Sequence, residues 1–230
     1  MYDNYIFDLY GTLVDIHTNE QKPSLWKNMA QYMTLQGAPY EPGELKKAYN
    51  QYIEELRVTP ETEIDLAQVL QRLYTEKGIA PTEEALAHWA MIFRALSLQY
   101  VRLFDGADTL LRELHSRGKR VYLLSNAQRL FTEPELRSLG IYDLFDDVFI
   151  SSDIGFMKPS RQFYASLLEK YSLDPKTSVM IGNDWQADSW GAHNMGLSSM
   201  YIHTPQSPQV EGELPPGCKR LNTILDVLNA

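Results

Sequence analysis

The chain has 230 residues, of which 44% are hydrophobic and 22% are charged. This balance is typical of a folded globular protein and excludes a fibrous or largely disordered one. The formal net charge of −9 argues against a surface that binds nucleic acid or lies on a membrane, because both need clusters of Lys and Arg. The length allows one substantial core and a second small one, so we expect one catalytic domain with an inserted or appended subdomain.

The first residues show no basic segment followed by a long apolar run, so we expect no signal peptide. No stretch approaches the roughly 20 apolar residues that cross a bilayer. A cytoplasmic location is therefore the expectation. The single cysteine, Cys218, excludes an internal disulfide and a cysteine-rich metal site. The sequence gives no indication of an oligomeric state.

A short apolar run at residues 5–7 stops at Asp8 and is followed by Gly11 and Thr12, a pattern typical of a buried strand that ends in a tight turn. Four similar runs follow, at residues 121–124, 148–150, 179–181 and 199–202. Helical patterns lie between them. Apolar strands that alternate with helices predict a parallel sheet covered on both faces. We therefore expect an α/β fold with a doubly wound parallel sheet, formed by residues 1–15 and 101–230.

Residues 16–100 have a different pattern. Five prolines separate what otherwise look like four amphipathic helices, whose apolar stripes are clearest in residues 64–74 and 86–100. This segment predicts a helical subdomain inserted between the first strand and the rest of the sheet.

Polar residues follow the predicted strands at the edge where ligands bind in open α/β sheets. They are Asp8, Thr12, Ser125, Asn126, Lys158, Asn183, Asp184 and Asp188. A carboxylate, a hydroxyl, a lysine and further carboxylates suit a phosphoryl group together with Mg²⁺, which prefers oxygen ligands. Taken singly, each residue is explained as well by a turn, a helix cap or a solvated charge. Their order and spacing favour a site.

The segments FDLYGTLVD, LLSNAQ, MKPS and IGNDWQAD occur in this order, each at a predicted strand end or its loop. Together they resemble the four motifs of the haloacid dehalogenase-like hydrolases, and the resemblance covers essentially the whole chain. It implies a Rossmann-like core. It also implies that residues 16–100 form the four-helix cap that closes over the active site in subfamily I members, with Asp15 and Asp105-Gly106 flanking the hinges.

The resemblance implies catalytic roles as well. Asp8 corresponds to the nucleophile that forms a covalent aspartyl intermediate. Ser125 corresponds to the hydroxyl that hydrogen-bonds the transferred group, and Lys158 to the residue that orients Asp8 and offsets negative charge. A carboxylate that attacks an anion is repelled unless cations neutralise both, and Lys158 and Mg²⁺ supply that charge. Thr12 and Tyr10 complete the expected catalytic set.

The same resemblance implies a metal site and a substrate site. Mg²⁺ is expected on Asp8, on the backbone carbonyl of Tyr10 and on Asp184, with Asn183 and Asp188 in support. The residues expected to bind the substrate are Tyr10, Gly11 and Asn126.

Tyr10 departs from the phosphatase pattern. Phosphatases of this superfamily carry a second Asp at that position, which acts as general acid and then as base. The form Asp-x-Tyr-Gly-Thr resembles instead the 2-haloacid dehalogenases, whose halide leaves without a proton. Tyr164 also matches a residue that dehalogenases use. Asp184 argues against a dehalogenase, because dehalogenases need no metal. A halide-binding arginine in the cap has three candidates, Arg57, Arg72 and Arg94.

Three functions remain in play. The first is an Mg²⁺-dependent phosphatase of small phosphorylated metabolites. General acid–base help typically contributes roughly 10²–10⁴-fold to a rate, so we expect an enzyme without it to favour leaving groups of low pKa. The alternative is a metal-independent 2-haloacid dehalogenase. The third is a weakly active member that binds phosphorylated ligands.

Overall fold

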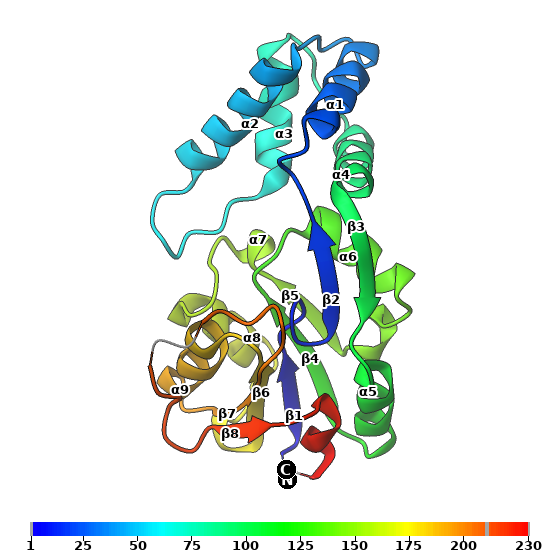
Figure 1. Ribbon diagram of the computed structural model, residues 1–230. Helices are drawn as coiled ribbons and strands as arrows, with labels where there is room; N and C mark the ends of the chain where they lie inside the picture. Colours follow the sequence, from blue (N-terminus) through cyan, green and yellow to red (C-terminus); the bar gives the residue numbers. More distant parts are fainter. Residues whose placement is uncertain (1, 210–211, 230) are drawn as a thin grey trace.

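The computed structural model describes residues 2–209 and 212–229. A six-stranded sheet with the order β5-β4-β1-β6-β7-β8 forms the lower part of the molecule in Figure 1. All its neighbouring strands are parallel, as the sequence predicts. The strands are β1 (Asn4–Phe7), β4 (Arg120–Ser125), β5 (Asp147–Ile150), β6 (Ser178–Gly182), β7 (Ser198–Ile202) and β8 (Lys219–Leu221). The first strand of the chain therefore lies in the middle of the sheet.

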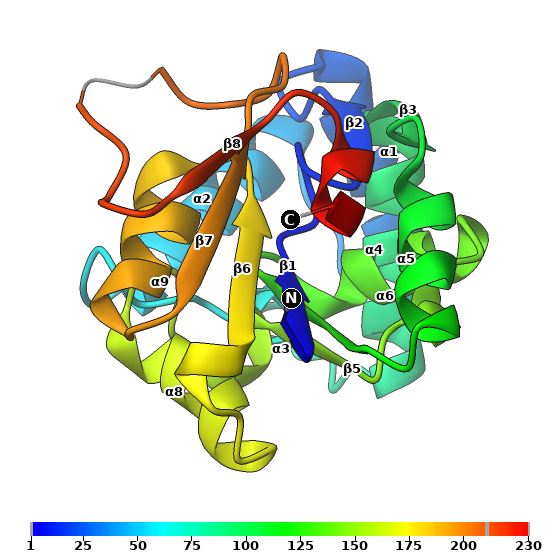
Figure 2. The ribbon, with the colours of Figure 1, turned by 90° about the horizontal axis from the view of Figure 1, so that it is seen from below.

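Helices cover both faces of this sheet, so the expected doubly wound α/β fold is confirmed. Tyr5 and Phe7 point into a core with α5 (Ala107–Ser116) and α6 (Arg129–Ser138), whereas Ile6 points into a core with α8 (Arg161–Lys170) and α9 (Gly191–Asn194). Figure 2 shows these helix pairs on opposite sides of the strands. The short helix α7 (Ser151–Ile154) follows β5 directly. Residues 224–229 form a 3-10 helix.

In the sequence, four helices separate β1 from the other strands of the sheet, and they lie at the top of Figure 1. They are α1 (Pro23–Leu35), α2 (Pro42–Leu56), α3 (Leu66–Glu76) and α4 (Glu83–Ser97). Pro23 and Pro42 occupy the first turns of α1 and α2, where a missing N–H costs nothing. Their apolar faces form a core of their own, in which the Trp89 and Phe93 rings stack 4.9 Å apart. We call α1–α4 the helical group.

Two antiparallel strands, β2 (Val14–Thr18) and β3 (Leu98–Leu103), join the helical group to the sheet. An ion pair of 2.8 Å between Asp15 and Arg102 lies across this ribbon. The domain boundaries expected at residues 16 and 100 fall inside these strands. None of the helices in the described part of the chain has the length and apolar character that a membrane crossing requires.

Candidate active site

Asp8 lies at the carboxyl end of the central strand β1, directly after Phe7. Its carboxylate accepts two hydrogen bonds, one at Oδ1 from Lys158 Nζ (2.8 Å) and one at Oδ2 from Thr12 Oγ1 (2.9 Å). The loop after Asp8 is tight, because the backbone N–H groups of residues 12–14 all reach the carbonyl of Leu9. The chain therefore holds this carboxylate in a fixed orientation before any ligand binds.

Gly11 allows that loop to pass close to β6. Its φ of +84° lies in the left-handed region, and a Cβ at this position would stand 2.2 Å from Asn183 Nδ2. Asn183 Oδ1 in turn accepts from Thr12 Oγ1 (3.3 Å). The side chain at position 11 is thus excluded by packing against Asn183, and a substrate could meet only the backbone there.

Lys158 is buried between two carboxylates. Its Nζ donates to Asp8 Oδ1 and, over 2.7 Å, to Asp188 Oδ1. Burial alone would lower the pKa of Lys158, but Asp188 and Asp8 outweigh it and raise that pKa. Burial also raises the pKa of Asp188 to about 7, against the effect of Lys158 and with the help of Asp8. Lys158 is therefore charged at neutral pH, and its single positive charge is shared between the Asp8 and Asp188 carboxylates.

Ser125 is the last residue of β4 and Asn126 follows it; both line the cavity that holds this ion cluster, but their hydrogen bonds differ. The Ser125 hydroxyl is buried and has no hydrogen-bond partner among the described residues. The Asn126 side chain is satisfied, because its amide donates to the carbonyl of Lys158 (2.9 Å) and accepts from the N–H of Lys158 (2.7 Å). Ser125 is thus free to bind a ligand, while the Asn126 amide fixes the loop that carries Lys158.

The turn after β6 brings three acidic or amide side chains to the same edge. Asp184 Oδ1 accepts from the backbone N–H groups of Gln186 and Ala187, both at 2.9 Å, and so caps the following helix, residues 185–190. Asp188 Oδ2 accepts from the N–H of Asp184 (2.9 Å). Of the three, Asn183 bonds to the same Thr12 hydroxyl as Asp8. Asn183 therefore contacts the loop after Asp8, whereas Asp184 Oδ1 is engaged in capping the helix that follows it.

The Tyr10 hydroxyl is directed away from this cluster and toward α6. It donates to Glu135 Oε2 and lies 3.1 Å from Thr132 Oγ1. Burial and the Glu135 carboxylate raise the pKa of Tyr10 far above its usual range. A phenol that already donates to a carboxylate and ionises with such difficulty is a poor proton donor for a leaving group.

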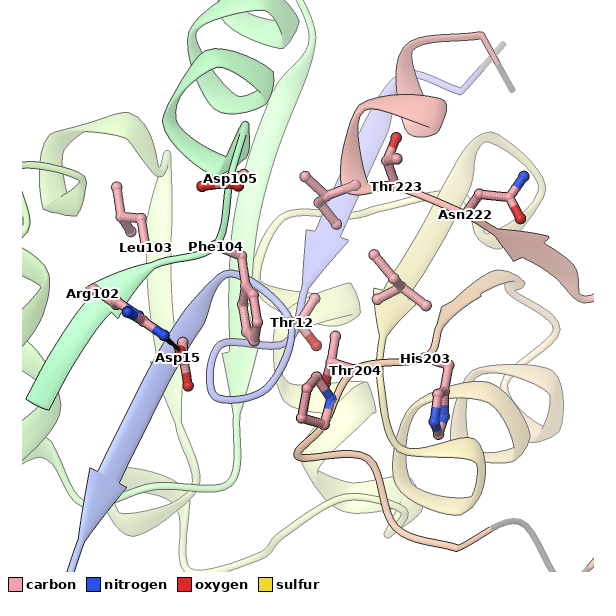
Figure 3. A pocket seen from close by; sticks show the side chains of 13 residues that line it. Thr12, Asp15, Arg102, Leu103, Phe104, Asp105, His203, Thr204, Asn222 and Thr223 are labelled. Carbon is pink, nitrogen blue, oxygen red and sulfur yellow. Dashed lines mark hydrogen bonds and ion pairs between the residues drawn. The ribbon is translucent and has the colours of Figure 1, made fainter.

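A cavity of about 190 Å³ opens above Asp8. Its lining contains most of the residues expected from the sequence: Asp8, Tyr10, Ser125, Asn126, Lys158, Asn183, Asp184 and Asp188. Gly11 and Thr12 do not line it. A larger cavity of about 550 Å³ borders Thr12 on its other side, between the β2–β3 ribbon and the carboxyl end of β7 (Figure 3). Neither Asp8 nor Lys158 lines the larger cavity, whereas both line the smaller one.

The donor set above Asp8 suits a hard cation. No group of three His, Cys, Asp or Glu side chains arranged to hold a metal ion occurs in the part of the chain that the structure describes. Magnesium does not need such a group, because it commonly uses one or two carboxylates and completes its shell with water and phosphate oxygens. The carboxylates of Asp8 and Asp184 and the amide oxygen of Asn183 meet that requirement at this cavity.

Several residues at the site were not expected from the sequence. Glu135 and Thr132 hold Tyr10. Arg94 of α4, one of the three arginines considered as a halide ligand, lies 2.9 Å from the other oxygen of Glu135. This contact is an ion pair. Thr204 donates to the carbonyl of Gly11 (2.7 Å). The only signal for Glu135 was its place on the buried side of an otherwise polar helix.

Comparison with known proteins identifies the family. The model of the haloacid dehalogenase-like hydrolases matches residues 2–196, and the chain belongs to this family of enzymes. A glyceraldehyde 3-phosphate phosphatase of Methanothermobacter thermautotrophicus is 33% identical over 104 residues, which are 45% of this chain and 46% of that protein. A glyceraldehyde 3-phosphate phosphatase of Pyrococcus furiosus is 23% identical over 85% of this chain and 78% of its own. The chain spans about half the length of the first relatives that it matches.

Solved structures share the fold. An HAD phosphatase from Thermococcus onnurineus aligns with a TM-score of 0.61 at 15% identity, over 99% of this chain and 96% of that one. A 2-haloacid dehalogenase from Pseudomonas syringae aligns with a TM-score of 0.66 at 16% identity, over 100% and 97%. Phosphatases and dehalogenases therefore share this architecture, and only the site can separate the two activities.

Proposed function

We propose that the protein is an Mg²⁺-dependent phosphohydrolase that acts on small phosphorylated metabolites through a phosphoaspartyl intermediate on Asp8. The observation that carries the proposal is the pairing of a fixed Asp8 carboxylate with the buried, unpartnered hydroxyl of Ser125 in one cavity. A buried hydroxyl without a partner is unfavourable, and a phosphoryl oxygen would satisfy it.

The residues divide the reaction between them. An Asp8 oxygen attacks phosphorus, the bond to the leaving oxygen breaks, and the electron pair departs with that oxygen. Lys158 keeps Asp8 aligned and offsets its charge, and Ser125 donates a hydrogen bond to the phosphoryl group. Water then attacks the phosphoaspartate and releases inorganic phosphate together with the free Asp8 carboxylate. Bound Mg²⁺, held by Asp8, the Tyr10 carbonyl and Asp184 or Asn183, would neutralise phosphoryl charge.

Tyr10 limits the range of substrates in this proposal. Its hydroxyl is committed to Glu135 and Thr132, so the leaving oxygen departs without a proton from position 10. The enzyme is then expected to favour aryl and acyl phosphates, whose leaving groups have low pKa values. A dependence of rate on leaving-group pKa no steeper than that of a relative with Asp at this position would contradict this part.

The helical group is proposed as the cap of the enzyme. The ribbon of β2 and β3 connects it to the sheet. Helices α2 and α4 supply walls to a cavity that shares Tyr10 and Asn126 with the cavity above Asp8. We propose that residues 16–100 close over the substrate and set its identity.

The test is hydrolysis of 4-nitrophenyl phosphate by the full chain, with Mg²⁺ and with a chelator. We expect phosphate release that needs the metal and disappears in Asp8→Asn, and mass spectrometry of acid-quenched enzyme should find a phosphoryl group on the peptide containing Asp8. Asp108→Asn, the same change on the exposed surface of α5, should retain the activity of the parent. Full turnover in Asp8→Asn would rule the proposal out.

A metal-independent 2-haloacid dehalogenase is the second candidate, and Tyr10 favours it. A halide leaves without a proton, so a committed Tyr10 hydroxyl would be no handicap. Asn183, a neutral residue beside Thr12, fits a site without metal. In this case 2-chloropropionate, and not the aryl phosphate, would be turned over, and the chelator would leave chloride release unchanged.

A further inference from the structure

The connection between α2 and α3 descends from the helical group to the sheet domain beside α7 (Figure 1). We call residues 61–66 of this connection the connecting segment. Around an isolated antiparallel bridge, the N–H of Glu63 donates to the carbonyl of Gly155, and the N–H of Met157 donates to the carbonyl of Glu61, both over 3.0 Å. The helical group is thus bonded to the sheet domain at a second place, besides the β2–β3 ribbon.

The Glu63 carboxylate extends this contact to two further loops. Its Oε2 accepts from Ser151 Oγ (2.7 Å) at the start of α7, and its Oε1 accepts from Gln128 Nε2 (3.1 Å) ahead of α6. The Gln128 amide also donates to the carbonyl of Ile64 (2.8 Å) and accepts from the N–H of Leu66 (2.8 Å). Because hydrogen bonds to an ionised group are stronger than neutral ones, Glu63 supplies the strongest side-chain links of the connecting segment.

These contacts lead to the loop that carries the catalytic lysine. Met157, which donates to the connecting segment, directly precedes Lys158. Ser151 Oγ also accepts from the N–H of Ala127 (2.9 Å), the neighbour of Asn126, whose amide bonds to both backbone groups of Lys158. No residue of the connecting segment lines the cavity above the nucleophile. The segment therefore supports the catalytic loops from outside, at a distance from the reacting atoms.

We propose that Glu63 is a positioning residue, which fixes the Lys158 loop while the helical group is seated on the sheet domain. If the helical group moves away, the loop loses its hydrogen bonds to the connecting segment, and Lys158 loses part of the support that aligns it with Asp8. The inference rests on the phosphohydrolase activity proposed above. It adds a residue that ties the alignment of the catalytic lysine to the position of the helical group.

Hydrogen exchange of the full chain tests this link without any reaction. Glu63→Gln keeps the shape of the side chain but replaces one of its two accepting oxygens by a donor. A hydrogen bond to a charged group is worth about 10-fold or more in a local opening equilibrium. We therefore expect the amides of Leu66 and Met157 to exchange about 10-fold faster in Glu63→Gln than in wild type, while those of β1 are unchanged.

Kinetics with two phosphoryl donors separate positioning from substrate binding, because Glu63 also lines the cavity that shares Tyr10 and Asn126 with the one above Asp8. The leaving groups of 4-nitrophenyl phosphate and acetyl phosphate differ greatly in size. We expect Glu63→Gln to lower kcat about 10-fold for both compounds, with KM within about twofold. A loss confined to the larger compound, or to KM, would make Glu63 a substrate-binding residue and overturn the proposal.

The control is Glu61→Gln, which removes the same charge from an exposed side chain two residues earlier and should match wild type in exchange and in kcat. Unchanged exchange at Met157 in Glu63→Gln would overturn the proposal. So would faster exchange that includes β1, since it would show a general loss of stability. If wild type hydrolyses neither compound, the proposed function fails, and the exchange rates still decide the inference: faster exchange confined to Leu66 and Met157 supports it.

Discussion

The ammonium of Lys158 lies between two carboxylates in a place with almost no access to solvent. Removing one partner from a buried ion cluster typically costs about 3–5 kcal/mol, because the remaining charges lose their compensation. We expect Lys158→Met to lower the free energy of unfolding by about this amount and to abolish hydrolysis. Urea unfolding and a phosphate-release assay measure the two effects.

Lys170→Met is the control for this prediction. Lys170 also pairs with an Asp, Asp147, at 2.7 Å, but its side chain is 57% exposed, and such surface pairs contribute about 1 kcal/mol or less. A loss of stability at position 158 no larger than the loss at position 170 would mean that the buried cluster is not the source of the effect.

Substitutions at Gly11 and Gly78 distinguish the cost of backbone strain from the cost of a steric clash. Both have a left-handed backbone, with φ of +84° and +77°, but a Cβ at Gly11 would collide with Asn183 whereas a Cβ at Gly78 has open space around it. Left-handed backbone costs a residue with a Cβ about 1–2 kcal/mol. We expect Gly78→Ala to lose about that amount and to keep full activity.

Gly11→Ala should lose more stability than Gly78→Ala, and most of its activity, because Asn183 and the nucleophile loop must move apart. Parallel thermal unfolding and steady-state kinetics of the two variants make the comparison. Equal effects of the two substitutions would show that the close approach to Asn183 does not matter.

The sequence indicated that position 10 departs from the phosphatase pattern, but it could not show what Tyr10 does instead. Its partners Thr132 and Glu135 are 122 and 125 residues away, and only the parallel packing of β1 and β4 brings α6 above it. The role of the Asn126 amide was equally hidden, since it depends on a loop 32 residues further along the chain. The sequence predicted which residues gather at the ends of the strands, but it did not predict the separate contacts that each of them makes.

Among the elements, the predictable strands were those buried on both faces. β1 and β6 are buried throughout and therefore appear in the sequence as continuous apolar runs. β2 alternates apolar and polar residues at Val14, Asp15, Ile16 and His17 and is only partly buried. A search for continuous apolar runs passes over such a strand. The strand β8 has three residues, two of them exposed, and carries no pattern at all.

Asp147 of β5 accepts hydrogen bonds from Lys170 and Tyr171 at the end of α8, and its contribution to stability depends on pH. Although burial opposes it, hydrogen bonds from Lys170 and Tyr171 lower the pKa of Asp147. A lowered pKa in the folded state means that Asp147 stabilises the fold above its ordinary pKa and loses this effect as the pH falls through the lower folded value. We expect Asp147→Asn to cost about 1 kcal/mol at neutral pH.

Denaturant unfolding of Asp147→Asn and wild type from neutral to strongly acidic pH measures this dependence. The difference between the two should be constant at neutral pH and should shrink only when the pH drops below the ordinary range of an aspartate, near 4. A difference that instead grows on acidification would refute the assignment.

At the scale of the whole molecule, one ion pair ties the helical group to the sheet domain and to Tyr10. Arg94 of α4 meets Glu135 of α6, and both side chains are largely buried. We expect Arg94→Met to destabilise the protein by about 3 kcal/mol, since it leaves the Glu135 carboxylate uncompensated. The double variant with Glu135→Met should lose clearly less than the sum of the two single losses.

A double-mutant cycle on the free energy of unfolding tests this coupling, and kcat/KM of the same four proteins shows whether it reaches the chemistry. Strict additivity would mean that the two side chains do not interact. The pair Asp15–Arg102, in which Arg102 is 69% exposed, should give a coupling energy below about 1 kcal/mol.

The ribbon of β2 and β3 has a consequence for how such a molecule can change over generations. Thr18 and Leu98 are partners across the ribbon, so the chain leaves the sheet and returns to it at a single point. An inserted segment whose two ends lie together can be lengthened, shortened or replaced without moving the strands that flank it. In the enzyme proposed above, the segment that selects substrates and the carboxylate that reacts therefore lie in separate stretches of the chain.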